Sequence, residues 1–432
     1  MLKNEFLPEV VLNDDEMMPK SLFTIFIDDI NDSYEERDEQ MVYDCILHFI
    51  NSLNNYKTVE NAEKLISTLD VVLNYYLGNK KILKMILKLL RIVFDKAKIN
   101  VQNHSNFFSI LFNLVLEPES EKILYLTICC FISILNYDNG SDDNFNYISN
   151  ILNPNIIIKK KNFLQLKGYY LLLFECYCMN KLNDEKGRII INVVKFCLEN
   201  ILDKEDYIIE IIIHLLSNYR INSKNSIHII YESGIIPYLE GLNFYLSEES
   251  IITILTIYGE IIQQETINYP IFDLKKLLKY KENQKILDTV IWLLLVYIEE
   301  CDAVQQFFNE PQFIQLLFDC INIGSSNLKI NSFLIYSRLI QQANRNQITS
   351  LLNFTIINEL FEAIELIEDS TIKTILLDGL ITVYKYLEFI NHSLFWDYIN
   401  KDNLIEYLSN NLFEENEEFS SRCSYFLNLI NS

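Results

Sequence analysis

Histidine and cysteine are the residue types best suited to hold metals or to act as nucleophiles, and their spacing in this chain favours neither role. No two of the five histidines stand three or four residues apart, the offset that places two ligands on one helix face. They are His48, His104, His214, His228 and His392. The nine cysteines lie mostly in apolar runs, which is typical of core residues in a reducing compartment. We therefore predict no metal site and no cofactor.

The sequence also lacks the local patterns that accompany common catalytic sites. It contains no glycine-rich phosphate loop, no G-x-S-x-G and no H-E-x-x-H, and it has only nine glycines. The loop DNGSDDN, at 138–144, lacks the Gly and terminal Glu spacing of an EF-hand and is interpreted as a polar turn. We predict no catalytic residues and no enzymatic activity.

Charge limits the class of partner. The formal net charge is -23, which opposes phosphate backbones and suits basic proteins, so nucleic acid is not an expected ligand. Carboxylates concentrate near the two ends of the sequence. They are Asp28, Asp29, Asp32, Glu35, Glu36, Asp38, Glu39, Glu414, Glu415, Glu417 and Glu418. The start of the chain does not resemble a signal peptide, and apolar runs stop short of the roughly 20 residues that cross a bilayer. We expect a protein of the cytoplasm and nucleus.

Hydrophobic periodicity predicts helices almost throughout. The segment 286–298 is apolar nearly all round, as expected of a helix packed between neighbours. Segments 313–321 and 356–367 are amphipathic and need cover on one face only. Hydrophobic residues make up 50% of the chain, with only seven prolines, a composition that favours helices joined by short polar turns.

Repetition gives the architecture. Segments 233–242, 310–321 and 353–364 each precede a polar break and a longer apolar helix. Their spacing fits a period of about 40 residues, with one unit skipped between the first two. That period predicts an all-α, right-handed solenoid of armadillo or HEAT-like repeats. We divide it into an acidic segment, 1–40, degenerate repeats, 41–205, and better-matched repeats, 206–432, within one continuous solenoid. Within 41–205, helices are predicted at 41–53, 59–77 and 80–94.

From residue 206 onward the chain resembles importin α, the armadillo adaptor for nuclear-localisation-signal cargo. The segments that carry the resemblance are SGIIPYLEGL from Ser233, ILTIYGEII from Ile254, IWLLLVYI from Ile291, LLDGLITVYKYLE from Leu376 and the ending EEFSSRCSYFLNLI. In that family, a Trp and an Asn four residues later line a groove on each inner helix. The Trp rings hold the stems of cargo Lys and Arg, and the Asn amide binds the cargo backbone.

The resemblance implies a set of peptide contacts in this chain. Asn218 occupies an Asn position with His214 in place of Trp, whereas Trp292 is retained with Val296 in place of its Asn. The remaining positions substitute other polar or aromatic residues. The implied cargo-peptide contacts are His214, Asn218, Glu260, Trp292, Phe333, Ser337 and Asp378.

The resemblance therefore implies an adaptor that binds Lys/Arg-rich linear signals in a concave groove for import into the nucleus. Recruitment of importin β stays open, because the family's basic N-terminal segment is replaced here by an acidic one. The alternative is an armadillo scaffold that binds proteins without import activity. Separately, the basic residues of 80–98 fit either an acidic partner, a membrane surface or, as the more ordinary interpretation, a solvated helix face.

Overall fold

The computed structural model of the protein describes residues 17–60, 62–137, 142–180, 182–201, 205–242, 246–265, 274–301, 304–390 and 393–431, except for the side chains of Asp142 and Phe354. Across these ranges all regular elements are helices, and one isolated bridge joins Met17 to Thr58. The chain divides into two compact units, Met1–Tyr238 and Leu239–Ser432. Each is described by itself.

The first unit consists of two layers of helices. In one layer each helix packs along the next, and we call its members the ladder helices. They are α2 (Glu39–Leu53), α4 (Lys80–Phe94), α6 (Glu121–Tyr137), α9 (Phe163–Met179) and α11 (Asp206–Asn222). The other layer covers one side of the ladder helices. It contains α1 (Lys20–Glu35), α3 (Ala62–Tyr76), η1 (Val101–His104), α5 (Ser105–Leu116), α7 (Asp142–Ile151), α8 (Pro154–Ile157), α10 (Asp184–Glu199), α12 (Ser226–Glu232) and α13 (Ile236–Glu240), which reaches the boundary between units.

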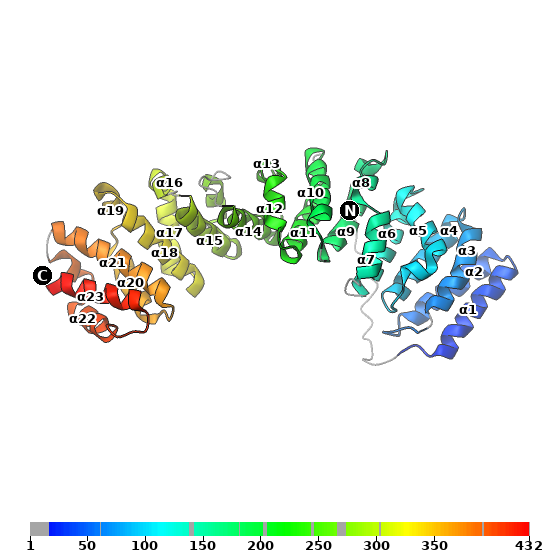
Figure 1. Cartoon of the computed structure of the whole chain (residues 1–432), viewed down its shortest axis with the longest axis horizontal. Coiled ribbons are helices and arrows are strands. Elements are labelled where there is room, and N and C mark those ends of the chain that lie inside the picture. Colours follow the sequence, from blue (N-terminus) through cyan, green and yellow to red (C-terminus); the bar gives the residue numbers. More distant parts are fainter. Residues whose placement is uncertain are drawn as a thin grey trace. The chain divides into compact units, whose positions relative to one another are not determined.

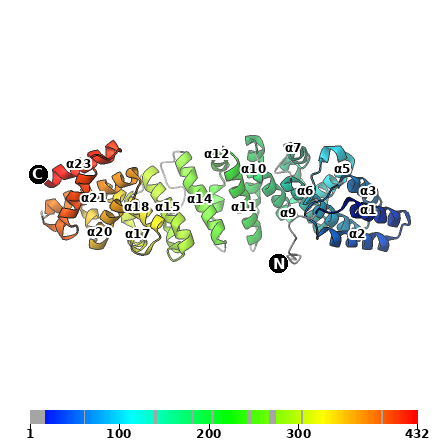
Figure 2. The same ribbon diagram turned by 90° about the horizontal axis from the view of Figure 1, so that it is seen from below.

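The second unit repeats this arrangement. Its ladder helices are α14 (Glu248–Gln264), α15 (Gln284–Glu300), α18 (Ser326–Gln342), α21 (Ser370–Ile390) and α23 (Glu417–Asn431). Its covering layer contains η2 (Leu274–Tyr280), α16 (Val304–Asn309), α17 (Pro311–Ile323), α19 (Arg345–Leu351), α20 (Phe354–Leu366), η3 (Leu394–Asp397) and α22 (Lys401–Asn410). Within each unit the helices follow one another in chain order (Figures 1 and 2). Both units are thus α-solenoids of armadillo or HEAT-like helical repeats, as predicted.

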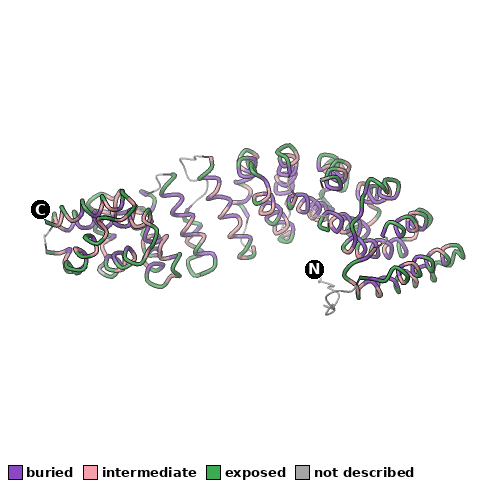
Figure 3. Tube along the Cα trace, turned by 60° about the horizontal axis from the view of Figure 1, so that its bottom comes forward, coloured by how far each residue is buried: buried purple, intermediate pink, exposed green. Residues whose placement is uncertain are grey.

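Burial explains the stacking. In α15 the core positions Ile286, Val290, Leu294 and Tyr297 are all at most 2% exposed. A helix that is apolar on most sides is stable only between neighbours, and α15 packs on α14 and α18. Buried and exposed stretches alternate along each helix in the same way throughout both units (Figure 3). The prediction of a buried helix at 286–298 is confirmed.

The N-terminal repeats are more regular than the sequence period indicates. Helices predicted at 41–53, 59–77 and 80–94 correspond to α2, α3 and α4, and they pack as pairs. Part of the acidic segment is also a repeat helix, because α1 packs on α2 through buried Phe23, Ile27 and Ile30. Of the predicted turn at 138–144, residues 138–141 lie outside the described ranges, and α7 begins at Asp142.

Polar side chains at helix starts fix the register between neighbouring repeats. Asn79 caps α4 through its side-chain oxygen, and its Nδ2 donates to Glu39 of α2 at 2.8 Å. Asn283 caps α15 in the same way and donates to Glu248 of α14 at 2.9 Å. Each cap satisfies backbone N–H groups and also joins two repeats.

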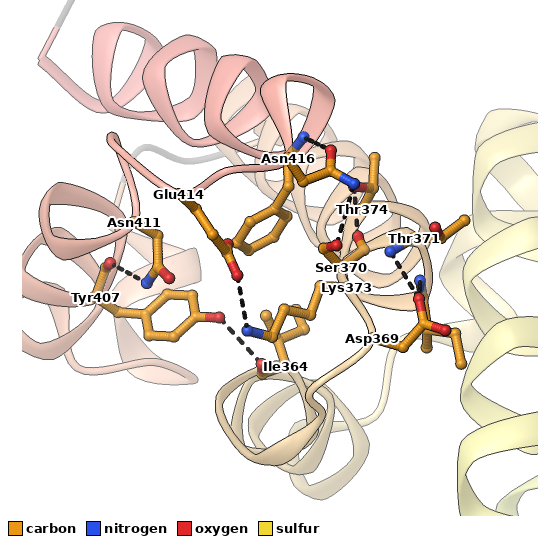
Figure 4. A network of polar contacts seen from close by, with 12 residues as sticks. Ile364, Asp369, Ser370, Thr371, Lys373, Thr374, Tyr407, Asn411, Glu414 and Asn416 are labelled. Carbon is orange, nitrogen blue, oxygen red and sulfur yellow. Dashed lines mark hydrogen bonds and ion pairs between the residues drawn. The ribbon is translucent and has the colours of Figure 1, made fainter.

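The last helix pair is joined to the unit by a polar network (Figure 4). Tyr407 of α22 donates to the carbonyl of Ile364 at 3.0 Å, and Lys373 of α21 pairs with Glu414 at 3.5 Å. Asn416, just before α23, donates to the Ser370 hydroxyl at 3.0 Å. These contacts connect covering and ladder helices, so we assign the cluster a structural role.

A buried ion pair joins α9 to the start of α11. The Lys167 side chain is 3% exposed, and its Nζ lies 2.7 Å from Oε2 of Glu205. Nζ also donates to the carbonyl of Asn200 at 3.3 Å. Burial of an ammonium group requires such partners, since an unpaired charge in the interior is strongly disfavoured.

We expect Glu205→Gln to lower the free energy of unfolding of the first unit by about 3 kcal/mol, because the substitution leaves the Lys167 ammonium without its counter-charge. Replacing both partners, with Lys167→Met and Glu205→Gln, is expected to restore much of the loss. Urea unfolding of the single and double variants measures both values. Equal stability of wild type and Glu205→Gln would contradict the assigned role of the pair.

Candidate functional site

Most cysteine thiols in the described ranges are free and buried. No group of three His, Cys, Asp or Glu residues there could hold a metal ion, and no helix is long and apolar enough to span a membrane. Burial raises the pKa of the Cys176, Cys197 and Cys320 thiols to about 12, so these thiols stay protonated at neutral pH. His392 lies outside the described residues.

The candidate site is therefore a surface, namely the side of the ladder helices that the covering layer leaves open. In the first unit three tyrosines occupy it, one on each of α6, α9 and α11. The ring centroids of Tyr125 and Tyr169 are 6.0 Å apart, and Tyr207 is 56% exposed. Gly168 of α9 permits the close approach of α11, because a Cβ there would stand 3.2 Å from the Tyr207 ring and 2.8 Å from Ile208. We call these three residues the tyrosine row.

A polar group lies farther along α9 and α11. Asn218 donates from Nδ2 to Oε1 of Glu175 at 3.5 Å, and His214, one turn earlier on α11, is exposed. Burial raises the pKa of the Glu175 carboxyl, while the nearby His214 lowers it. The structure thus brings the predicted pair His214 and Asn218 together with a carboxylate. An amide and a carboxylate on one face can bind the backbone and a cationic side chain of an extended peptide.

In the second unit Trp292 lies on the ladder helix α15, which packs on α14. Its ring packs on Gly259 of α14 so closely that a Cβ at Gly259 would stand 2.3 Å from Cη2. The Trp292 side chain is half-buried, as is Glu260, the next residue after Gly259. Val296, one turn after Trp292, is 2% exposed. This position therefore presents the tryptophan ring without a polar partner one turn later.

Two predicted contacts are not at the surface. Phe333 is 3% exposed and Ser337 is fully buried in α18. A Cβ at Gly379 of α21 would stand 2.6 Å from Oγ of Ser337, so the two helices meet at this point. Arg338 and not Ser337 is partly open to solvent. Neither Phe333 nor Ser337 is available to a ligand in this arrangement, and we leave both out of the candidate site.

The last predicted contact, Asp378, is already paired. Its Oδ1 lies 3.2 Å from Nε of Arg422 on α23. Burial raises the pKa of the Asp378 carboxyl, and Arg422 opposes that shift. One helix earlier, Arg338 lies 3.8 Å from Glu299. A basic ligand would have to compete with these arginines, so the open face of α18 and α21 has no uncompensated negative charge at Asp378.

Sequence reasoning missed the tyrosine row and Glu175. Tyr125, Tyr169 and Tyr207 succeed one another at the spacing of the repeats, but so do other tyrosines of the chain, among them the buried Tyr219, Tyr258, Tyr297 and Tyr336. The spacing therefore does not distinguish exposed tyrosines from core tyrosines. Glu175 stands on α9, in the part where the repeat period is blurred. The signal that identifies it is its distance of 43 residues from Asn218, which is one repeat.

We expect Gly259→Ala to lower the stability of the second unit by about 1–3 kcal/mol, because the added methyl group overpacks against the Trp292 ring. The emission of Trp292, recorded in a Trp396→Phe background, should shift as the ring is displaced. Gly78→Ala is the control, since a Cβ at Gly78 has no atom within 4 Å. Equal unfolding midpoints for the two variants would contradict the packing of Trp292 on Gly259.

We expect Glu175→Gln to raise the unfolding temperature at neutral pH. The folded carboxyl has a pKa above 4.5, so the folded state keeps this proton to a higher pH than the unfolded state does. Stability from this group is present at low pH and is lost as pH rises from 4.5 through the folded pKa. Thermal unfolding of wild type and variant should agree below pH 4.5 and diverge above it. The control Glu415→Gln makes the same substitution at an exposed position.

Comparison with known proteins supports the fold alone. No family model matches the chain, and no curated protein matches it. Among solved structures, the chain is similar to an engineered protein from the Northeast Structural Genomics Consortium, with a TM-score of 0.63 and 10% sequence identity. The match covers 94% of this chain and 99% of that one. At this identity the likeness establishes a shared helical-repeat architecture and carries no function.

Proposed function

We propose that this chain is a non-enzymatic, protein-binding adaptor whose first unit binds Lys/Arg-rich linear segments on the open face of α9 and α11. The observation that carries the proposal is the group formed by Glu175, His214 and Asn218 beside the tyrosine row. Aromatic faces attract cations and cover their aliphatic stems, while the carboxylate supplies charge and the amide binds peptide backbone.

Energetics also favour a carboxylate with a ligand-binding role at Glu175. Its burial opposes ionisation, so the residue weakens the folded protein at neutral pH. A stability cost at an open polar cluster is typical of binding and catalytic sites. A cationic side chain of a ligand, placed over Glu175, would offset that cost. If the role of Glu175 were only structural, glutamine could fill the same position without the cost.

The specific form we propose is nuclear import, with the partners bearing nuclear localisation signals and the adaptor acting in cytoplasm and nucleus. The resemblance to importin α and the net charge of -23 support it. Trp292, packed on Gly259, would add a second contact region in the second unit. Importin β is a further candidate partner within this form of the proposal.

A second candidate function is an armadillo scaffold without import activity. Specific observations favour it: Phe333 and Ser337 are buried, and Asp378 is paired with Arg422. These are positions at which the import adaptors' contacts would fall in the later repeats. Under this alternative the repeats still bind proteins, but the ligand is not a classical localisation signal.

Titration of a fluorescent Lys/Arg-rich signal peptide into the full chain tests the proposal. We expect Asn218→Ala and Glu175→Gln each to weaken binding about five- to tenfold, because each removes a hydrogen bond or charge pair to the peptide. Asn113→Ala is the matched control, since Asn113 is exposed on α5 in the covering layer of the same unit. Trp292→Ala measures separately whether the second unit contributes.

Two results would count against the proposal. Absence of binding, or binding indifferent to Asn218, Glu175 and Trp292, would rule out the adaptor on these surfaces. The second result is that the chain binds the peptide but a signal-bearing fluorescent cargo does not accumulate in the nuclei of permeabilised cells. This result would reject nuclear import and favour the scaffold alternative.

A further inference from the structure

A basic strip runs along the open face of α4, in a protein that is otherwise strongly acidic. Lys84, Lys88 and Arg91 follow one another at helical spacing and are all at least partly exposed. Within the described ranges, Lys84 and Lys88 have neither an ion pair nor a hydrogen bond through the ammonium group. Most other lysines of the first unit are engaged, as Lys64 is with Asp28 and Lys160 with Glu117.

The register of the repeats places apolar side chains on either side of this strip. Lys81 of α4 donates to Gln40 of α2, 41 residues earlier, at 3.3 Å, and its ammonium lies 4.1 Å from the centroid of the Tyr43 ring. Leu47 is 38% exposed, and the same offset of 41 residues pairs it with Lys88. On the other side α6 presents Tyr125, which is 39% exposed.

The charges that face the strip do not neutralise it. Arg91 pairs with Asp95, four residues later, at 4.0 Å. On α2, Asp44 accepts a hydrogen bond from Gln40 at 2.8 Å and, among the described residues, forms no ion pair with the strip. On α6, Lys122 adds a further exposed cation next to Glu121. The positive charge of Arg91 also lowers the pKa of Cys129, although burial, the larger effect, raises it.

We propose that the open face of α2, α4 and α6 is a second docking surface, which binds an acidic linear segment of a partner protein through Lys84, Lys88 and Arg91. Charge complementarity selects the ligand: two unpaired ammonium groups and a guanidinium group bind carboxylates, and the flanking Leu47 and Tyr125 take apolar side chains between them. Long polyanions are disfavoured, because they would extend beyond the strip over a protein of net charge -23.

The open face of α2, α4 and α6 is narrow enough for a short peptide segment to cross it. Neighbouring ladder helices lie about 8–10 Å apart, so three of them span about 20 Å. An extended peptide covers that span with about six residues. Acidic side chains two residues apart lie on the same face of such a segment and can reach the cations of α4, and an apolar residue at each end can reach α2 and α6. Tyr125 belongs both to this surface and to the tyrosine row. The test of this surface varies only Lys84, Lys88 and Leu47, which are not part of the site in the proposed function, so the two proposals are tested separately.

The test is a fluorescence-anisotropy titration of the full chain with a labelled peptide of alternating Glu and Leu residues. We expect Lys84→Glu with Lys88→Glu to weaken binding at least about tenfold at low salt, and added salt to weaken wild-type binding. The matched control is Lys159→Glu with Lys161→Glu. It makes the same charge change at two exposed lysines of the first unit, in the turn before α9. This control should bind within about twofold of wild type.

Leu47→Ser tests whether the peptide binds a docking surface or is held by charge attraction alone. We expect this substitution to weaken binding of the peptide by about threefold, because apolar burial is lost. Equal losses in the two charge-reversal variants would overturn the proposal, as would full binding by Lys84→Glu with Lys88→Glu. Tighter binding of anionic lipid vesicles than of the peptide, with the same dependence on Lys84 and Lys88, would assign the strip to a membrane and also overturn it. Circular dichroism of each variant checks that the helices are retained.

Discussion

Stacking of helices that are apolar on most sides is the constraint on which the rest of this structure depends. A ladder helix such as α15 has too little polar surface to face water on two sides, so it is stable only with a helix before it, a helix after it and a covering layer beside it. Each neighbour in turn requires the same cover. Stability is therefore shared along each unit, and no single repeat has a core of its own.

That constraint also limits where a ligand can bind. Three sides of a ladder helix are covered, so only one narrow strip of its surface reaches solvent. The residues of that strip follow one another every three or four positions along the helix. On α11 the strip includes His214 and Asn218, and on α4 it includes Lys84 and Lys88. Residues from successive repeats then lie side by side although they are about 40 residues apart in the chain. Function in such a protein depends on which side chains occupy these strips.

The period of the sequence was sufficient to predict the fold, because stacking imposes the same apolar pattern on every repeat. The period was not sufficient to predict which residues of each helix face solvent. One residue corresponds to about 100° of rotation on a helix, so an error of one position moves a side chain from solvent into the core. In α18 the prediction chose Phe333 and Ser337, whereas Arg338 is the partly exposed residue. The period of the sequence also does not predict ion pairs between helices, such as the pair of Asp378 and Arg422.

Charge is distributed unevenly over the open face of the first unit. The α4 strip is basic, and the surface of α9 and α11 carries Glu175 beside the tyrosine row. Both belong to one layer of one compact unit, and only α6 separates α4 from α9 in that layer. Interactions between exposed charges decay over about 8 Å at physiological salt, which is less than the width of two helices. Each region therefore acts on a short ligand largely by itself, whereas the overall charge of the chain acts on ligands long enough to extend beyond one strip.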